Sequence, residues 1–137
     1  MKKLFSVILS FALVLAVTVL PDHAHAQIVK PVTLSKTTLT NTDTSKATLS
    51  VDRSVASIEV KVVKTSGTVA GTVKLQGTFD GINYDDLNTL TLSDQILNRK
   101  VMAISTPLIY PGYRLIFIAS GTNVTTVSAK QLRRSDY

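Results

Sequence analysis

Four oxygen-bearing side chains gather in one short stretch of the chain: Asp80, Asn83, Asp85 and Asp86. Carboxylate and amide oxygens are the ligands that Ca²⁺ prefers, and this cation takes six to eight of them. The spacing matches no EF-hand loop, because Gly81 directly follows the first aspartate. Asp80-Gly81 is instead a strong hairpin-turn signal that needs no metal. We therefore predict a turn with solvent-facing acids, and neither a metal nor a cofactor.

The adjacent acids Asp85 and Asp86 also fail as a catalytic pair of the glycosidase type. Neighbouring residues of a strand point to opposite faces, so these two carboxylates cannot flank one bond. The chain has no cysteine, and its two histidines, His23 and His25, lie in a leading segment described below. Once that segment is removed, a thiolate nucleophile, an imidazole base and an ordinary zinc site are all excluded. We expect no enzymatic activity.

Three tyrosines, Tyr84, Tyr110 and Tyr113, are candidates for recognition. A tyrosine presents an apolar ring with a polar tip, which suits contact with a protein or a sugar. Tyr110 is the foremost of the three, because it lies in a loop punctuated by proline and glycine. Sugar-stacking platforms favour tryptophan, which the chain lacks, and tyrosines at strand ends often cover the core. Both interpretations remain open at this point.

Lys130, Arg133 and Arg134 form the one basic cluster of residues 27–137, near the C-terminus. Such a cluster holds an acidic partner or a phosphate, or it is simply a solvated tail. Residues 27–137 have 13 basic and 8 acidic residues, a net charge of +5, and outside this cluster the charges are scattered along the chain. Nucleic-acid-binding proteins gather such charge into a stripe, so we expect no nucleic-acid partner.

Residues 1–26 have the pattern of an export signal. Lys2 and Lys3 precede an apolar stretch that ends at Pro21, and the small residues Ala24 and Ala26 flank a cleavage site. We predict a signal helix that is cleaved after Ala26. The alternative is a retained membrane anchor, although the apolar stretch is short beside the roughly 20 residues that span a bilayer. The protein is then exported to the periplasm, the cell surface or the medium, and it touches the membrane only through this segment.

Residues 27–137 are expected to form a single all-β domain. Threonine, serine, valine and isoleucine are abundant, and β-branched residues favour strands. No window has the apolar period of a helix. The pattern predicts an antiparallel β-sandwich, jelly-roll-like, of about eight strands. In the hairpin around Asp80, alternation places Phe79 and Leu87 toward the core. The predicted strands are 33–42, 47–51, 56–63, 72–79, 84–92, 99–105, 113–119 and 124–132.

The hairpin region also carries a resemblance to a known group of proteins. The run K-T-S-G-T-V-A-G at 64–71 leads into V-K-L-Q-G-T at 73–78, followed by Asp80-Gly81 and Asn83-Tyr84. Further on come the pairs 113–114 (Tyr-Arg) and 121–122 (Gly-Thr). Over residues 56–130 this pattern resembles small, often signal-bearing proteins encoded by tailed phages that infect Bacteroidota. Thr78 and Tyr84 stand where serine and tryptophan are common in that group.

The resemblance implies a non-enzymatic phage structural protein: a virion decoration, fibre or surface component that assembles with other virion proteins or with itself as an oligomer. It implies no catalytic residues. The alternative function is a secreted or cell-surface binding module that recognises a glycan or a component of the host envelope. The signal-like segment 1–26 distinguishes these two functions. Tailed-phage heads assemble in the cytoplasm and their parts do not normally need export, whereas a secreted module does. The expected location is therefore the exported compartment or the virion.

Overall fold

The computed structural model describes residues 27–52, 55–104 and 108–134, without the side chains of Gln27, Ala56 and Arg134. The predicted signal helix and its cleavage site at Ala24 and Ala26 lie outside these residues. Over the described ranges the chain consists of strands and connecting loops. No helix in this part is long and apolar enough to cross a membrane.

The described ranges contain nine strands, one more than predicted. The additional strand is β1, which includes Pro31 and pairs only with β9 at a sheet edge. An edge position is where a strand proline is tolerated, because it has no N–H to donate to a neighbour. The strands are β1 Gln27–Pro31, β2 Thr38–Thr40, β3 Thr44–Leu49, β4 Val55–Gly67, β5 Ala70–Thr78, β6 Asp85–Leu92, β7 Leu97–Ala103, β8 Gly112–Ser120 and β9 Asn123–Arg134.

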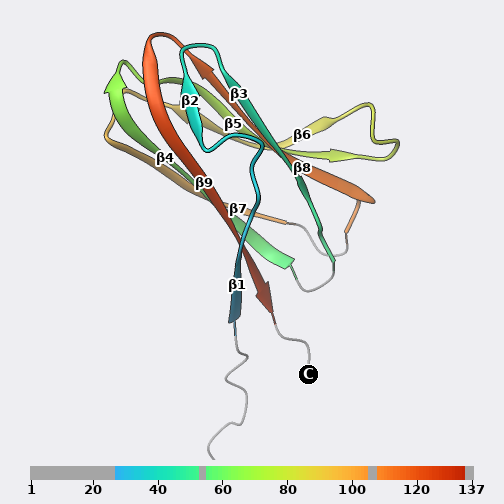
Figure 1. Ribbon diagram of the computed structural model, residues 1–137. Coiled ribbons are helices and arrows are strands. Elements are labelled where there is room, and N and C mark those ends of the chain that lie inside the picture. The colour runs from blue at the N-terminus through green and yellow to red at the C-terminus, as the bar shows by residue number, and fades with distance from the viewer. Residues whose placement is uncertain (1–26, 53–54, 105–107, 135–137) are drawn as a thin grey trace, which may run out of the picture.

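These strands form two antiparallel sheets that face each other (Figure 1). Sheet A has the order β1-β9-β4-β7, and β2 pairs with another part of β9. Sheet B has the order β3-β8-β5-β6. The strand order from β2 to β9 follows the jelly-roll pattern, in which two interlocked Greek keys form a sandwich. The predicted all-β sandwich is confirmed.

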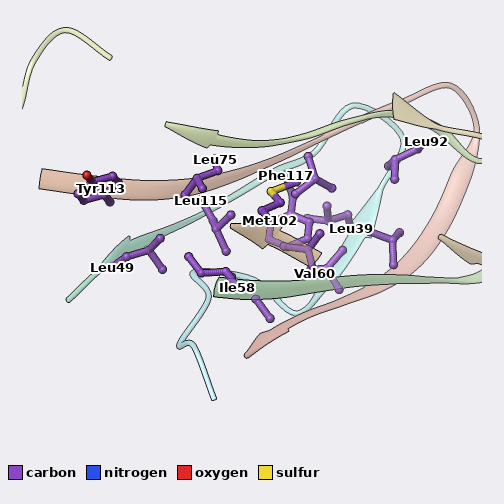
Figure 2. Packing of buried hydrophobic residues seen from close by; sticks show 14 of the residues in the cluster. Leu39, Leu49, Ile58, Val60, Leu75, Leu92, Met102, Tyr113, Leu115 and Phe117 are labelled. Atoms are coloured by element: carbon purple, nitrogen blue, oxygen red, sulfur yellow. The ribbon is translucent and has the colours of Figure 1, made fainter. Parts of the chain in front are cut away.

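The core lies between the two sheets and is almost entirely aliphatic. The strand predicted at 56–63 is part of β4, in which Ile58, Val60 and Val62 share one face and are all fully buried. Phe117 of the central strand β8 is the largest fully buried side chain. Figure 2 shows the packed side chains running from Tyr113 at one end of the core to Leu92 at the other.

Two core assignments in the hairpin were wrong. Phe79 is 68% exposed, because β5 ends at Thr78 and the chain has already turned out of the sheet. Leu87 is 41% exposed. In the register between β5 and β6, Leu75 faces Asn88 and Gln76 faces Asp86, so Leu87 is the extra residue of a bulge. A bulge interrupts the period-2 alternation on which the prediction rested.

The two open sides of the sandwich are closed differently. On one side the segment between β1 and β2 bridges the sheets, since Val32 donates to the Ala129 carbonyl and Ser35 to the Lys46 carbonyl, each at 2.9 Å. On the other side Lys100 of β7 reaches across to the Thr89 carbonyl of β6 at 2.6 Å. A lysine placed on an edge strand in this way also hinders pairing with a further chain.

We predict that Phe117→Ala lowers the free energy of unfolding by about 3–5 kcal/mol, because it removes a large buried side chain and leaves a cavity. Chemical denaturation followed by circular dichroism measures the change. Ile96→Ala is the matched control, since Ile96 is 78% exposed in the loop between β6 and β7, and its effect should stay within about 0.5 kcal/mol. Equal losses in the two variants would contradict the assigned core.

Candidate binding surface

The strands β3, β5 and β7 end at the same end of the sandwich, here called the loop end, which comprises the described loop residues 50–52, 79–84, 104 and 108–111. The register brings them together, because Tyr113 at the start of β8 lies opposite both Leu49 of β3 and Gly77 of β5. The β5–β6 hairpin projects from this end in Figure 1. Loops carried by a rigid sandwich are a common location for binding residues.

Tyr110 occupies the centre of the loop end. Its ring lies directly on the backbone of Gly77, where an added Cβ would come within 2.5 Å of the ring. The ring centroid is 4.8 Å from that of Phe79 and 6.1 Å from that of Tyr113. Its hydroxyl donates to Asp85 Oδ2 at 3.0 Å. Tyr110 therefore fastens the loop before β8 to the β5–β6 hairpin.

The Asp85 carboxylate that accepts this hydrogen bond raises the pKa of the Tyr110 hydroxyl. A phenol held next to a carboxylate gives up its proton less readily, because the resulting phenolate would face a like charge. Tyr110 thus stays protonated over the ordinary pH range. It serves here as a hydrogen-bond donor and a packing surface.

Tyr113 lies beneath Tyr110 and belongs to the core. It is only 4% exposed, and its hydroxyl accepts a hydrogen bond from the Tyr110 backbone N–H at 3.3 Å. A side chain buried to this degree supports the loop above it and offers almost no surface to a partner. The ring of Tyr113 closes the row of packed side chains in Figure 2.

Tyr84 lies on a different face from Tyr110. Its ring stacks on the guanidinium of Arg114, with the Arg114 Cζ atom 3.3 Å from the ring centroid. Arg114 Nε donates to Gln76 Oε1 at 2.7 Å, and Gln76 Nε2 donates to Asp86 Oδ1 at 2.5 Å. Both Lys74 and Gln76 donate hydrogen bonds to the Asp86 carboxylate, and these bonds lower its pKa, with the larger effect from Lys74. Tyr84 therefore covers a polar network on the outer face of sheet B.

The acids of the hairpin are engaged by neighbouring protein groups. The Asp80 carboxylate accepts hydrogen bonds from the backbone N–H groups of Ile82 and Asn83 at 2.8 and 2.7 Å, and also from the Asn83 amide and the Thr78 hydroxyl. These bonds hold its pKa well below the usual range. Asp85 accepts a hydrogen bond from the Tyr110 hydroxyl, and Asp86 accepts one from the Lys74 ammonium group. In the part of the chain that the structure describes, no group of three acids, histidines or cysteines is placed to hold a metal ion.

Sequence reasoning missed the apolar residues that surround Tyr110. Phe79, Leu87 and Ile109 are exposed, Ile109 by 62%, and Ile82 at the hairpin tip is exposed by 80%. A cleft of about 140 Å³ opens between Leu87, Ile109 and Tyr110, with the core side chains at its floor. Two sequence signals could have revealed this surface. Large apolar residues flank the Asp80-Gly81 turn on both sides, and Ile109 lies beside Tyr110 in the loop punctuated by proline and glycine.

The basic cluster predicted near the C-terminus does not form a single patch. Lys130 projects from the outer face of sheet A, whereas Arg133 is turned inward by the strand alternation. Arg133 pairs with Asp52 at 2.9 Å and donates to the Ser50 carbonyl at 3.1 Å, so it anchors the loop after β3. Arg134 ends β9, and its side chain lies outside the described residues.

No family model and no curated protein matches this chain. Among solved structures, similarity is found to a glycoside hydrolase family 43 arabinoxylan arabinofuranohydrolase from Bacillus subtilis, solved in complex with cellotetraose, with 14% identity and a TM-score of 0.41. The alignment covers 81% of this chain and 27% of the hydrolase, so the chain spans about a quarter of that protein. A family 6 carbohydrate-binding module is similar with 15% identity and a TM-score of 0.42, over 82% of this chain and 95% of the module. Similarities this distant do not indicate a function.

The Asp80 turn predicts a pH dependence of stability. Its folded-state pKa is depressed, so its contribution is complete above the unfolded pKa of about 3.9 and is lost as the pH falls below that value. We expect Asp80→Asn to lower the melting temperature at pH 7 and to show a smaller drop than wild type between pH 5 and pH 2. Thermal unfolding followed by circular dichroism measures both.

The matched control is Asp85→Asn, which changes an acid of the same hairpin whose side chain accepts one hydrogen bond from the described residues, that of Tyr110. At pH 7 it should lower the melting temperature less than Asp80→Asn does, because the Asp85 side chain accepts one of the hydrogen bonds described here and that of Asp80 accepts four. If Asp80→Asn retained the full wild-type drop, the turn would not be the source of the pH dependence.

Proposed function

We propose that this protein is a non-enzymatic binding domain that attaches to a partner protein through its loop end. The observation that carries the proposal is the group of exposed apolar side chains around Tyr110: Phe79, Leu87 and Ile109. Exposed apolar groups that cluster around a cleft are typical of interaction sites, whereas singly scattered ones are not. Tyr110 holds this surface rigid, which reduces the entropy lost on binding.

The shape and chemistry of the cleft favour a protein partner. Its volume of about 140 Å³ is close to that of an apolar cavity that accepts benzene, about 150 Å³. One aromatic or branched side chain of a partner would fill it. Large side chains anchored in pockets of this kind dominate the energy of many protein interfaces. The aliphatic side chains of Leu87 and Ile109 offer no hydrogen bonds to sugar hydroxyls.

Within this class, we propose a structural component of a phage particle: a decoration, fibre or surface protein that assembles with other virion proteins or with itself. The support is the sequence resemblance over residues 56–130, which includes the Asp80-Gly81 hairpin that carries the loop end. A rigid β-sandwich with a binding surface on its loops suits such a role. The fold alone does not specify it, because one fold hosts many functions.

A second candidate is a secreted or cell-surface module that binds a glycan. Tyr84 favours it, because an aromatic ring beside Arg114, Gln76 and Asp86 combines a stacking surface with hydrogen-bonding groups. Such a combination is suited to a sugar ring. This candidate uses the outer face of sheet B and leaves the cleft at Tyr110 unexplained.

The two candidate functions predict different locations for the protein. A particle component would be recovered in virions, and a module with a functional export signal would be recovered in the host envelope or the medium. The expected cleavage after Ala26 belongs to the second route, in which the mature chain begins at Gln27. We propose the particle as the main location.

The proposal predicts that purified virions contain this chain. Quantitative mass spectrometry of the particles, with the host envelope fraction as comparison, measures its amount and its first residue. In complementation, Phe79→Ser combined with Ile109→Ser should reduce incorporation at least tenfold, because the apolar surface is lost. Ile96→Ser changes an isoleucine outside the loop end that is more exposed than Ile109, and it should leave incorporation unchanged. Virions without the chain would refute the particle role, and full incorporation of the double variant would refute the loop end.

The glycan candidate makes a separate prediction. A glycan array should then show binding by the wild-type protein and loss of it in Tyr84→Ala, while Phe79→Ser binds normally. We expect the array to be blank for all three proteins. A signal that depends on Tyr84 would favour the second candidate over the first.

A further inference from the structure

The outer face of sheet A carries a shallow groove that the loop end does not include. Two adjoining hollows of about 280 and 170 Å³ share Glu59, Arg99 and Lys130 as lining residues. They lie across β9, β4 and β7, with Val29 of β1 at one margin. We call this surface the sheet A groove. None of its lining residues belongs to the loops around Tyr110.

The groove is organised in rows that follow the strand register. One row joins Lys130, Glu59 and Val101, and the next joins Ser128, Lys61 and Arg99. Apolar side chains lie in the rows beyond, with Val29 and Leu132 on one side and Leu97 on the other. Successive rows are two residues apart along each strand, which corresponds to about 6.6 Å.

The two central rows have an excess of positive charge. Arg99 forms an ion pair with Glu59, and among the described residues no other acid lines the groove. Lys61 and Lys130 have no ion pair with any described residue, and both are exposed. Two copies of this surface would repel each other if they met face to face, because each would bring two unpaired lysines. The charge of the groove therefore favours an acidic partner.

The rows also indicate the form of that partner. An extended peptide repeats its side chains on one face every second residue, at the same spacing of about 6.6 Å. Two acidic residues separated by one position would meet the two cationic rows. Apolar residues two positions further out would meet Val29 and Leu132 at one end and Leu97 at the other. The margins are aliphatic, which suits the side chains of a peptide better than the rings of a sugar.

We propose that the sheet A groove binds an extended acidic segment of a partner protein with the pattern apolar-x-acidic-x-acidic-x-apolar, lying along β4 and β9. The segment places its two carboxylates against Lys130 and against Lys61 with Arg99. Its outer apolar residues cover the aliphatic margins. This surface is separate from the loop end, so an experiment can refute either binding proposal and leave the other standing.

The test uses a fluorescein-labelled seven-residue peptide with leucine at both ends, two glutamates two positions apart in the middle, and serine elsewhere. Fluorescence anisotropy should show saturable binding to the full-length protein. The Lys61→Glu, Lys130→Glu double variant should bind at least roughly tenfold more weakly, since two attractions become repulsions. Glu59→Gln should bind severalfold more tightly because it releases Arg99. Binding should weaken as NaCl rises from 50 to 500 mM.

Two controls make the result specific. The Lys30→Glu, Lys46→Glu double variant has the same net charge as the groove variant, but both of its exposed lysines lie off the groove, and it should bind as wild type does. A peptide with lysine in place of glutamate should not bind. Circular dichroism confirms that each variant is folded.

Several outcomes would overturn the proposal. One is the absence of binding between the wild-type protein and the peptide at millimolar concentration, and another is equal weakening of binding by the two charge-reversal variants. A third is displacement of the peptide by polygalacturonate that binds more tightly than the peptide, which would indicate an anionic glycan as the ligand. A dimer seen in sedimentation equilibrium and lost in the groove variant would assign the face to a second copy of this chain.

Discussion

The pairing of β9 with β4 is the interaction on which the rest of the structure depends. It joins residues far apart in the chain, such as Val63 and Thr126, so its formation carries the entropy cost of closing a long loop. Once formed, it provides the centre of sheet A, with β1 and β2 on one side and β7 on the other. The inward side chains of the pair, among them Val60 and Val127, are fully buried. The outward ones, Glu59 and Lys130, line the sheet A groove. The same two strands therefore build the core and one of the two candidate surfaces.

The sequence predicted the fold class well and the site only in part, for physical reasons that individual residues show. The strong alternation in β4 arises because one face of the strand lies on the core and the other faces outward, and this pattern is visible in the sequence. Phe79 was misplaced because alternation does not reveal where a strand stops, and Leu87 because a bulge is invisible without its partner strand. Tyr110 was identified as a loop residue, but its attachment to Gly77 and Asp85 depends on contacts between distant segments. The sheet A groove could not be predicted at all, because its rows arise from the register of four strands.

The two candidate surfaces differ in the physics of recognition. At the loop end, burial of Phe79 and Ile109 against a partner would supply the affinity, with little dependence on salt. In the sheet A groove, the exposed cations Lys61 and Lys130 would act mainly on the rate of encounter and on the choice of partner. A domain with one surface of each kind can hold one partner tightly while it engages another reversibly. Tyr113 shows how the first surface is kept in shape, since its buried ring supports Tyr110 from below.

The register of β1 on β9 has a mechanical consequence. Gln27 is paired with Arg134, so the strand that begins the described sandwich and the strand that finishes it emerge side by side (Figure 1). Tension that separates these two points would open the β1–β9 ladder one rung at a time, like a zipper, and would meet little resistance. Tension between Gln27 and a partner held in the sheet A groove would instead act along the strands and strain several rungs together. The direction of the load, rather than the number of hydrogen bonds, would then determine how firmly the domain stays folded while it is attached.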